Sequence, residues 1–345
     1  MQRLVLIDGH AIIHRAYHAL PPLTSSSGQL VNAVYGFVSM LLRVIEELKP
    51  THMAVCFDLP GPTFRHEAYI AYQAKRPVMD KELSGQIELV HEVVEAAGIP
   101  IYTAAGFEAD DVIGTLAGQS KSKFKSKIDE VVIVTGDRDI LQLVSGPTSP
   151  RLRGASKVKV YMTIRGLAEA KMFDEKEVEE YIGIKPEQII DYKALIGDSS
   201  DNYPGVPGIG PKTAVGLLKK YASLDILYRK MEGARLDSTS SARRGGWKLE
   251  GITPAVVQKL KEGKEAAMLS QNLAQIRTDA PVELDLERAH LRDLRENEGF
   301  IEKLRELRFK SLVARLDSAR LGRLNSGNPP SRKATEGRGG QMGLL

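Results

Sequence analysis

Several short apolar runs in the first 140 residues each lead into a carboxylate. The pairs are residues 4–7 with Asp8, 53–57 with Asp58, 131–134 with Asp137, and the weaker run 99–102 with Glu108. Runs of four or five aliphatic residues without polar alternation predict strands that are buried on both faces. A sheet built from these runs would therefore carry acidic side chains at the ends of its strands.

Helical stretches separate the apolar runs, for example at 34–48 and 87–97. Strand and helix alternating in this way predict an α/β fold, with a central, mostly parallel sheet and helices on both faces. In such a sheet a ligand binds outside the carboxyl ends of the strands. We therefore expect the acids to share one site at that edge.

The pattern changes after about residue 165, where strand candidates become few. We expect an α/β core over 1–165, a helical subdomain over 166–316, and a disordered tail or linker over 317–345 that has little apolar content. Helices are predicted at 169–181, 186–196, 212–221 and 254–275, and loops at 145–150 and 237–246.

Composition excludes several classes of protein. No run approaches the roughly 18 apolar residues of a membrane span, and the N-terminus lacks the apolar core of a signal peptide. A single cysteine, Cys56, allows neither an intramolecular disulfide nor a multi-cysteine metal site. These features predict a cytoplasmic protein with no membrane partner, and the net charge of +4 is compatible with nucleic acid.

Nine acids form the candidate site: Asp8, Asp58, Glu108, Asp110, Asp111, Asp137, Asp139, Asp198 and Asp201. Oxygen ligands favour hard cations such as Mg²⁺ or Mn²⁺. Two such ions about 4 Å apart would stabilise the attacking and leaving oxygens of phosphodiester hydrolysis. Each acid alone could equally be a helix cap, a turn residue or a solvated surface group. The set favours a shared metal site, because separate strand ends deliver its members to one edge.

A glycine-rich segment at 205–214 predicts a helix–hairpin–helix. Its candidate DNA-binding residues are Gly205, Gly208, Ile209, Gly210, Lys212 and Thr213. The glycines let backbone amides approach a phosphate closely, and the second helix adds its N-terminal dipole. The segment is not a P-loop, because Pro211 separates the last glycine from Lys212. An ordinary Gly/Pro turn is the alternative.

Basic and aromatic residues are mixed between Asp58 and Glu108, among them Tyr72, Lys75 and Arg76. This mixture suits a single nucleic-acid strand, whose phosphates need cations and whose bases need stacking partners. A solvated charged helix is the alternative. Three histidines at 10, 14 and 18 could share a helix face, but no neighbouring Glu or Cys supports zinc, so a polar face or a phosphate contact is favoured.

Five motifs resemble the 5′ nuclease family, most closely the 5′→3′ exonuclease (flap endonuclease) domain of bacterial DNA polymerase I. They are LVLIDGHAIIHRAYHALPPL, AVCFDLPGPTFRHEAY, GFEADDVIGTLA, VTGDRDILQLV and LIGDSSDNYPGVPGIGPKTA. The motifs occur in family order, and the resemblance covers roughly residues 1–315, which makes the signal highly specific.

The resemblance implies a PIN-like fold and a structure-specific, two-metal 5′ nuclease. Its substrate would be DNA with a free 5′ end (a flap, a nick or an RNA-primed end), in replication and repair such as Okazaki primer removal. It assigns Asp8, Asp58, Glu108, Asp110 and Asp137 to a first metal, Asp139, Asp198 and Asp201 to a second, and Asp111 to the wider cluster. A DNA polymerase domain, in cis or in trans, is the expected protein partner, and the chain itself is expected to be a monomer.

The resemblance also assigns the DNA contacts. Arg76 and Tyr72 match residues beside the scissile bond, the segment 60–95 matches an arch that admits the 5′ strand, and the hairpin matches a duplex-binding motif that can hold K⁺. One position departs from the family, which carries Lys where this chain has Gln73. Gln adds no charge to stabilise a transition state, and Lys75 would point about 200° away on a regular helix. We therefore expect reduced turnover in an enzyme whose acids are intact.

Two other functions stay open. A PIN-type metal-dependent ribonuclease would use a similar acidic sheet edge, but it would usually lack the hairpin and the long basic segment. A weakly active module that binds branched DNA would fit Gln73, but acids without cations would repel phosphates. The sequence leaves open whether the chain is free-standing or part of a longer polymerase.

Overall fold

The computed structural model describes residues 1–345 except 26, 125–126, 147–156, 168, 237–251 and 327–345. Its centre is a six-stranded sheet in the order β3-β2-β1-β4-β5-β6. The strands are β1 (Arg3–Asp8), β2 (His52–Cys56), β3 (Ile101–Tyr102), β4 (Glu130–Thr135), β5 (Lys157–Arg165) and β6 (Glu169–Phe173). All pairings are parallel except that of β5 with β6. The predicted mostly parallel α/β sheet is confirmed.

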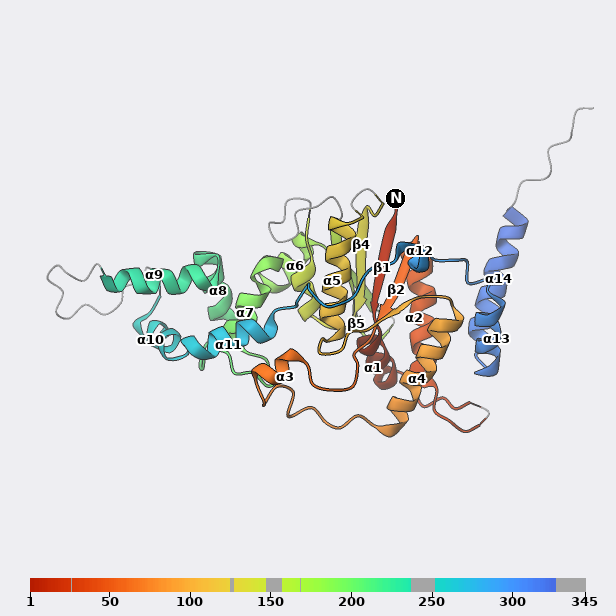
Figure 1. Cartoon of the computed structure of the whole chain (residues 1–345), viewed down its shortest axis with the longest axis horizontal. Coiled ribbons are helices and arrows are strands. Elements are labelled where there is room, and N and C mark those ends of the chain that lie inside the picture. Colours follow the sequence, from red (N-terminus) through yellow and green to blue (C-terminus); the bar gives the residue numbers. More distant parts are fainter. Residues whose placement is uncertain (26, 125–126, 147–156, 168, 237–251, 327–345) are drawn as a thin grey trace, which may run out of the picture.

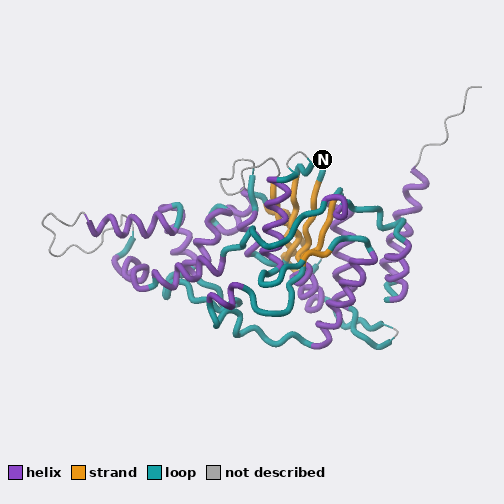
Figure 2. The backbone as a smooth tube through the Cα atoms, in the orientation of Figure 1, coloured by secondary structure: helices purple, strands orange, loops and turns teal. Residues whose placement is uncertain are grey.

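Helices cover both faces of the sheet (Figures 1 and 2). Leu4 and Leu6 of β1 share a core with α5 (Ala109–Ser122). Val5 and Ile7 point to the other face, where α1 (Gly9–Ala19), α2 (Asn32–Leu48) and α4 (Lys81–Ala96) pack. Successive side chains of a strand alternate between faces, so an apolar run without alternation is explained by burial on both sides.

The sheet extends beyond the predicted domain boundary at residue 165. Residues 169–173, which were predicted to be helical, form β6 and pair with β5. Neither of these two strands was predicted from the sequence. Helix α6 (Glu175–Ile182) begins only after Asp174, whose side chain accepts hydrogen bonds from the amides of Lys176 and Glu177. This cap fixes where the helix starts. The loops predicted at 145–150 and 237–246 lie wholly or largely outside the described residues.

Helices gather at one end of the molecule, to the left of the sheet in Figure 1. They are η2 (Pro186–Gln188), α7 (Ile189–Ile196), α8 (Pro211–Tyr221), α9 (Leu224–Leu236), α10 (Pro254–Glu262) and α11 (Lys264–Ala274). The two helices predicted around the glycine-rich hairpin, α7 and α8, are present. The predicted helix at 254–275 is two helices that meet at Gly263, where an added Cβ would lie 2.7 Å from Cγ1 of Val206.

The last helices return to the α/β core, so 166–316 is not one helical unit as predicted. They are α12 (Leu286–Ala289), α13 (Glu298–Glu306) and α14 (Lys310–Ser326). Phe300, Leu304 and Leu312 are buried with α2 and α4. The tail predicted to be disordered from residue 317 is helical through Ser326, because its Ala, Leu and Arg residues favour continuation of α14. The remainder, 327–345, lies outside the described residues.

The predicted arch at 60–95 is shorter in the structure. Residues 81–95 belong to α4, whose Val90, Val93 and Val94 are buried against the core that contains α2. The segment from 58 to 80, including the short helix α3 (Phe64–Ala68), crosses the edge of the sheet where the parallel strands end (Figure 1). None of the helices in the described parts of the chain combines the length and apolar character that a membrane crossing requires.

Candidate metal centre and nucleic-acid cleft

Three predicted acids follow three neighbouring strands at one edge of the sheet. Asp8 ends β1, Asp58 follows β2 and Asp137 follows β4. Together with Glu108 and Asp110 they line a cleft of about 630 Å³. Because β1 lies between β2 and β4, this cleft is at the point where the strand order reverses, where α/β sheets bind ligands. The structure thus brings these five acids together at one cleft.

Thr135 links two of these acids. Its Oγ1 donates to Oδ2 of Asp8 at 2.7 Å and accepts from the amide of Asp137 at 2.9 Å. Oδ1 of Asp8 accepts from the amide of Ala11 at 3.0 Å, so Asp8 also caps α1. Thr135 was not predicted to be a site residue, although a threonine at the end of a buried strand is a signal for such a role.

The N-terminus of α5 brings further acids to the cleft. Glu108 occupies its N-cap and Asp110 its first turn, where negative charge is favoured. Oδ1 of Asp58 accepts from the amide of Ala109 at 2.7 Å, so this acid also holds the start of α5. Nδ1 of His10, on α1, lies 3.1 Å from Oδ2 of Asp58. The first of the three histidines therefore contacts an acid of the site.

The acids are crowded: Asp8 is buried, and Glu108, Asp110 and Asp139 are half-buried. Burial, with repulsion from neighbouring carboxylates, raises the pKa of Asp8, Glu108 and Asp139 to about 7. The same causes raise the pKa of Asp110 well above its ordinary value. Such a site disfavours its own negative charge, and a bound divalent cation would compensate it. The donor set therefore fits a hard metal ion.

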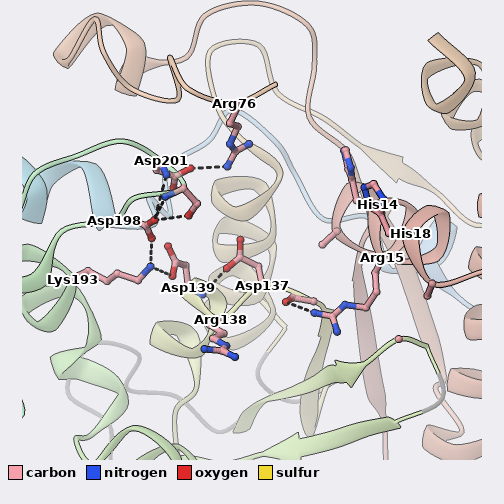
Figure 3. A pocket seen from close by; sticks show the side chains of 15 residues that line it. His14, Arg15, His18, Arg76, Asp137, Arg138, Asp139, Lys193, Asp198 and Asp201 are labelled. Atoms are coloured by element: carbon pink, nitrogen blue, oxygen red, sulfur yellow. Dashed lines mark hydrogen bonds and ion pairs between the residues drawn. The ribbon is translucent and has the colours of Figure 1, made fainter. Parts of the chain in front are cut away.

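A second group of acids lies beside the first. Oxygens of Asp139, Asp198 and Asp201 all come within 4.8 Å of one another, a spacing that could hold a metal ion. They line a second cleft of about 800 Å³ that also includes Asp137 (Figure 3). Asp137 and Arg76 line both clefts, so the two groups form one continuous acidic surface.

Lys193 already bridges two acids of the second group. Its Nζ lies 2.6 Å from Oδ1 of Asp139 and also donates to Oδ2 of Asp198 (Figure 3). Burial alone would lower the pKa of Lys193, but the two carboxylates raise it, so the ammonium stays charged. Burial would raise the pKa of Asp198, but hydrogen bonds from Lys193 and Ser200 lower it. The sequence analysis missed Lys193.

The turn that carries Asp198 and Asp201 is held by the side chain of Asp198 and requires a glycine at position 197. Oδ1 of Asp198 accepts from the amides of Ser200 at 2.7 Å and Asp201 at 3.3 Å. Gly197 has φ +73°, and a Cβ there would lie 2.6 Å from the carbonyl carbon of Pro204. No other residue fits that conformation without strain, which explains the local sequence around the two acids.

The basic segment, residues 58–80, contacts acids of both groups. Nη2 of Arg76 lies 2.6 Å from Oδ1 of Asp201, and the Tyr72 hydroxyl donates to Oε2 of Glu108 at 3.2 Å. Gln73 has φ +55°, and its backbone N–H donates to the backbone carbonyl of Asp201 at 2.9 Å. The segment is therefore irregular here, and a helical geometry does not apply. Lys75 is exposed and lines neither cleft.

Asp111 lies apart from the acids that line the clefts. Its two oxygens accept from Arg65 at 2.7 and 2.9 Å, and they also accept from the amides of Glu108 and Arg277 at 3.0 and 2.8 Å. The residue is fully buried. Its hydrogen-bonding capacity is used within the protein, so Asp111 positions Glu108 rather than facing the cleft.

Not every residue predicted in the hairpin is available to contact DNA. The side chain of Ile209 is buried and its amide donates to the carbonyl of Val206, so neither is free to contact DNA. Gly208 has φ +76°, and its carbonyl accepts from Nζ of Lys259 at 3.0 Å. Lys212 is exposed and Thr213 half-buried in the first turn of α8, while Gly205 and Gly210 flank the turn.

Comparisons with known proteins agree with this architecture. Two family models match: "5′-3′ exonuclease, N-terminal resolvase-like domain" over residues 3–183, and "5′-3′ exonuclease, C-terminal SAM fold" over 184–297. The change of model at 184 is later than the predicted boundary and agrees with the end of α6.

A 5′-3′ exonuclease from Aquifex aeolicus is 34% identical over 319 residues, which cover 92% of this chain and 96% of that protein. DNA polymerase I from Bacillus caldotenax is 38% identical over 317 residues, but the chain spans only 32% of its length. A solved T5 5′-exonuclease with bound zinc has a TM-score of 0.59 at 17% identity over 93% of this chain and 99% of that one, which shows the fold. By these matches the chain belongs to the 5′-3′ exonuclease family.

Proposed function

We propose that the chain is a divalent-metal-dependent, structure-specific 5′ nuclease that hydrolyses phosphodiesters of DNA with a free 5′ end. One observation carries the proposal. Carboxylates from the ends of β1, β2 and β4 share a cleft with the N-terminus of α5, and three further carboxylates lie beside them within 4.8 Å of one another. Such a pair of acidic groups suits Mg²⁺ or Mn²⁺ and phosphate chemistry.

Two cations are assigned to two sets of ligands. The first would be held by Asp8, Asp58, Glu108, Asp110 and Asp137, and the second by Asp139, Asp198 and Asp201. When bound, the cations supply charge that stabilises the attacking and departing oxygens of a phosphodiester. The protein orients the ligands beforehand, because Thr135 fixes Asp8 and the amide of Asp137, while the amide of Ala109 fixes Asp58.

Basic and polar side chains near the acids would bind the negatively charged phosphates of the substrate. Arg76 lines both clefts and is the cation placed to contact a phosphate between them. The second cleft is lined opposite the acids by Arg15, His14 and His18, while Arg138 lies beside Asp137 and Asp139 (Figure 3). These side chains would bind neighbouring phosphates. Gln73 would donate a hydrogen bond but no charge, which predicts slow turnover.

The substrate is inferred from two separate parts of the chain. The first turn of α8 and the preceding glycines would bind duplex DNA through backbone amides, with K⁺ at the hairpin carbonyls, independently of sequence. The segment 58–80 would cover the 5′ strand over the acids. We infer flaps, nicks and RNA-primed ends as substrates in replication and repair, a polymerase domain in cis or in trans as partner, a monomeric chain and a cytoplasmic location.

The test is cleavage of a labelled 5′-flap duplex in Mg²⁺, Mn²⁺ or EDTA. We expect cutting with either metal, a product that carries a 5′-phosphate, and no cutting in EDTA. Asp137→Ala should lose activity, since Asp137 faces both clefts, and undiminished cutting by this variant would contradict the proposal. Preferential cutting of single-stranded RNA would favour a PIN-type ribonuclease.

A weakly active DNA-binding module is the second candidate, and Gln73 favours it. Its signature would be tight binding of the flap duplex in Ca²⁺ with no product after Mg²⁺ is added. Hydrogen bonds hold the carboxylates of Asp8 and Asp58 in place, and this order argues for catalysis. A module that only binds DNA would gain nothing from ordered, crowded carboxylates, because they repel phosphates.

A further inference from the structure

The hydroxyl of Tyr203 is buried and has no hydrogen-bond partner among the described residues. The residue is only 3% exposed, and its ring belongs to a small apolar cluster with Tyr72, Ile190 and Leu273. A buried hydroxyl without a partner costs free energy. Such groups are rare in folded proteins, so this one points to a water or ligand that completes it.

The backbone fixes Tyr203 beside the second acid group. The amide of Tyr203 donates to the carbonyl of Asp198 at 3.0 Å, and the amide of Asp198 donates to the carbonyl of Tyr203 at 2.9 Å. This pair closes the turn that carries Asp201. A tyrosine phenol is neutral and protonated at neutral pH.

A small chamber lies where the phenol meets the acids. Its volume is about 40 Å³, and its polar lining consists of two tyrosines, two arginines and five acids: Tyr72, Tyr203, Arg65, Arg76, Glu108, Asp110, Asp137, Asp139 and Asp201. A chamber of this size and polarity has room for a water molecule but not for a nucleotide. The carboxylates can only accept hydrogen bonds when they are ionised, whereas a phenol can both donate and accept. Tyr203 therefore offers a neutral hydrogen-bonding group that a water molecule in this chamber could use.

We propose that Tyr203 is a positioning residue for the second cation. Its hydroxyl hydrogen-bonds a water molecule of the chamber that hydrates the cation held by Asp139, Asp198 and Asp201. The inference rests on the proposed function, since it requires a cation at these acids. It explains why a hydroxyl without a partner is kept beside them, because the cation brings in the water that completes its hydrogen bonding.

Tyr203→Phe tests this assignment, because it removes one oxygen and keeps the ring in its apolar cluster. Without metal, we expect the variant to melt at the same or a higher temperature than the wild type, since an unpaired buried hydroxyl is gone. Calorimetric titration with Mn²⁺ should show about tenfold weaker binding at one site. The rise in melting temperature that saturating Mn²⁺ produces should be correspondingly smaller.

Tyr228→Phe is the matched control. Tyr228 is similarly buried, but its hydroxyl donates to the carbonyl of Leu260 at 3.0 Å, in the helical part of the chain away from the acids. This variant should melt at a lower temperature with and without Mn²⁺, by the same amount, and should bind Mn²⁺ as the wild type does. A merely structural role for Tyr203 would likewise leave the Mn²⁺ affinity and the Mn²⁺-dependent rise in melting temperature of Tyr203→Phe unchanged.

These experiments distinguish a failure of the role of Tyr203 from a failure of the proposed function. If the wild type binds Mn²⁺ and Tyr203→Phe binds it with the same affinity and the same rise in melting temperature, the role of Tyr203 is overturned while the proposed function stands. If the wild type binds no Mn²⁺, the proposed function fails and the inference fails with it. Weaker Mn²⁺ binding confined to Tyr203→Phe supports both.

Discussion

Nζ of Lys193 lies 2.6 Å from Oδ1 of Asp139, within the same group of acids that could hold a cation. The ammonium also donates to Asp198, so it uses oxygens of two of the three candidate ligands. In the absence of metal, Lys193 therefore neutralises this part of the site. A divalent cation at Asp139, Asp198 and Asp201 would have to displace or repel it.

We expect Lys193→Met to have opposite effects on stability and on metal binding. Without metal the variant should be about 2 to 4 kcal/mol less stable, because partly buried carboxylates lose their partner. Mn²⁺ should bind more tightly, because its competitor is gone. Urea unfolding and Mn²⁺ titration measure the two effects. The control is Lys264→Met, whose ion pair with Glu232 is exposed, so its loss should change neither stability nor Mn²⁺ binding measurably. Weaker Mn²⁺ binding by Lys193→Met would show that the lysine supports the cation instead.

Gln73→Lys should increase turnover on a 5′-flap duplex about tenfold, because it adds a positive charge where the transition state gains negative charge. Nε2 of Gln73 lies 3.4 Å from Oδ1 of Asp201, so the longer ammonium side chain reaches the same region. Single-turnover cleavage under saturating Mg²⁺ is the measurement. Lys75→Gln is the control and should leave the rate unchanged, since Lys75 is exposed and lines neither cleft. A slower Gln73→Lys variant would contradict the expected role of this position.

Thr135→Val should reduce cleavage by at least about tenfold, because it removes the hydroxyl that joins Asp8 to the amide of Asp137. Its stability should fall by about 1 to 3 kcal/mol. Thr115→Val is the matched control, since the Thr115 hydroxyl also donates and accepts within the core but contacts no cleft residue. The control should lose similar stability and keep its cleavage rate. Equal rates for the two variants would show that Thr135 does not organise the site.

The ion pairs of Glu130, a residue outside the acidic site, predict how the stability of the fold depends on pH. Its carboxylate oxygens lie 2.6 Å from Nε of Arg3 and 2.9 Å from Nζ of Lys159. Burial would raise the pKa of Glu130, but hydrogen bonds from Lys159 and Arg3 lower it below its ordinary value of 4.5. The folded state therefore releases this proton more readily than the unfolded state does. The resulting stability is present above pH 4.5 and is lost as the pH falls through the lower folded-state pKa.

Glu130→Gln should thus be about 2 kcal/mol less stable than the wild type at pH 7, and the difference should shrink below about pH 4.5. Urea unfolding from pH 7 to pH 3 measures this. Glu283→Gln, which breaks an exposed pair with Lys123, serves as control and should show at most about 1 kcal/mol at any pH. A difference that is independent of pH would contradict the ion-pair explanation.

The sequence predicted the sheet and most of the site because buried parallel strands leave a clear signal. Asp8, Asp58 and Asp137 each follow an apolar run, and the order of parallel strands brings such ends together. Strand β6 was missed because its five residues include exposed positions and carry no apolar run. The return of α13 and α14 to the core was missed because their apolar residues indicate a buried face but not which partner buries it.

Hydrogen-bond partners were the least predictable part of the site. Lys193 and Tyr203 lie close to Asp198 in sequence, yet nothing in their spacing indicates that one bridges Asp139 and the other lacks a partner. Asp111 belongs to the same short motif as Asp110, but one turn of α5 directs it to Arg65 instead of the cleft. Such differences depend on side-chain directions within the packed fold, which a one-dimensional pattern does not specify.

Anomalous scattering from crystals soaked in Mn²⁺ tests the central claim most directly. The account predicts one manganese peak among Asp139, Asp198 and Asp201 and another among the carboxylates of Asp8, Asp58 and Asp137. Manganese bound elsewhere, or no peak at these acids at millimolar Mn²⁺, would contradict it.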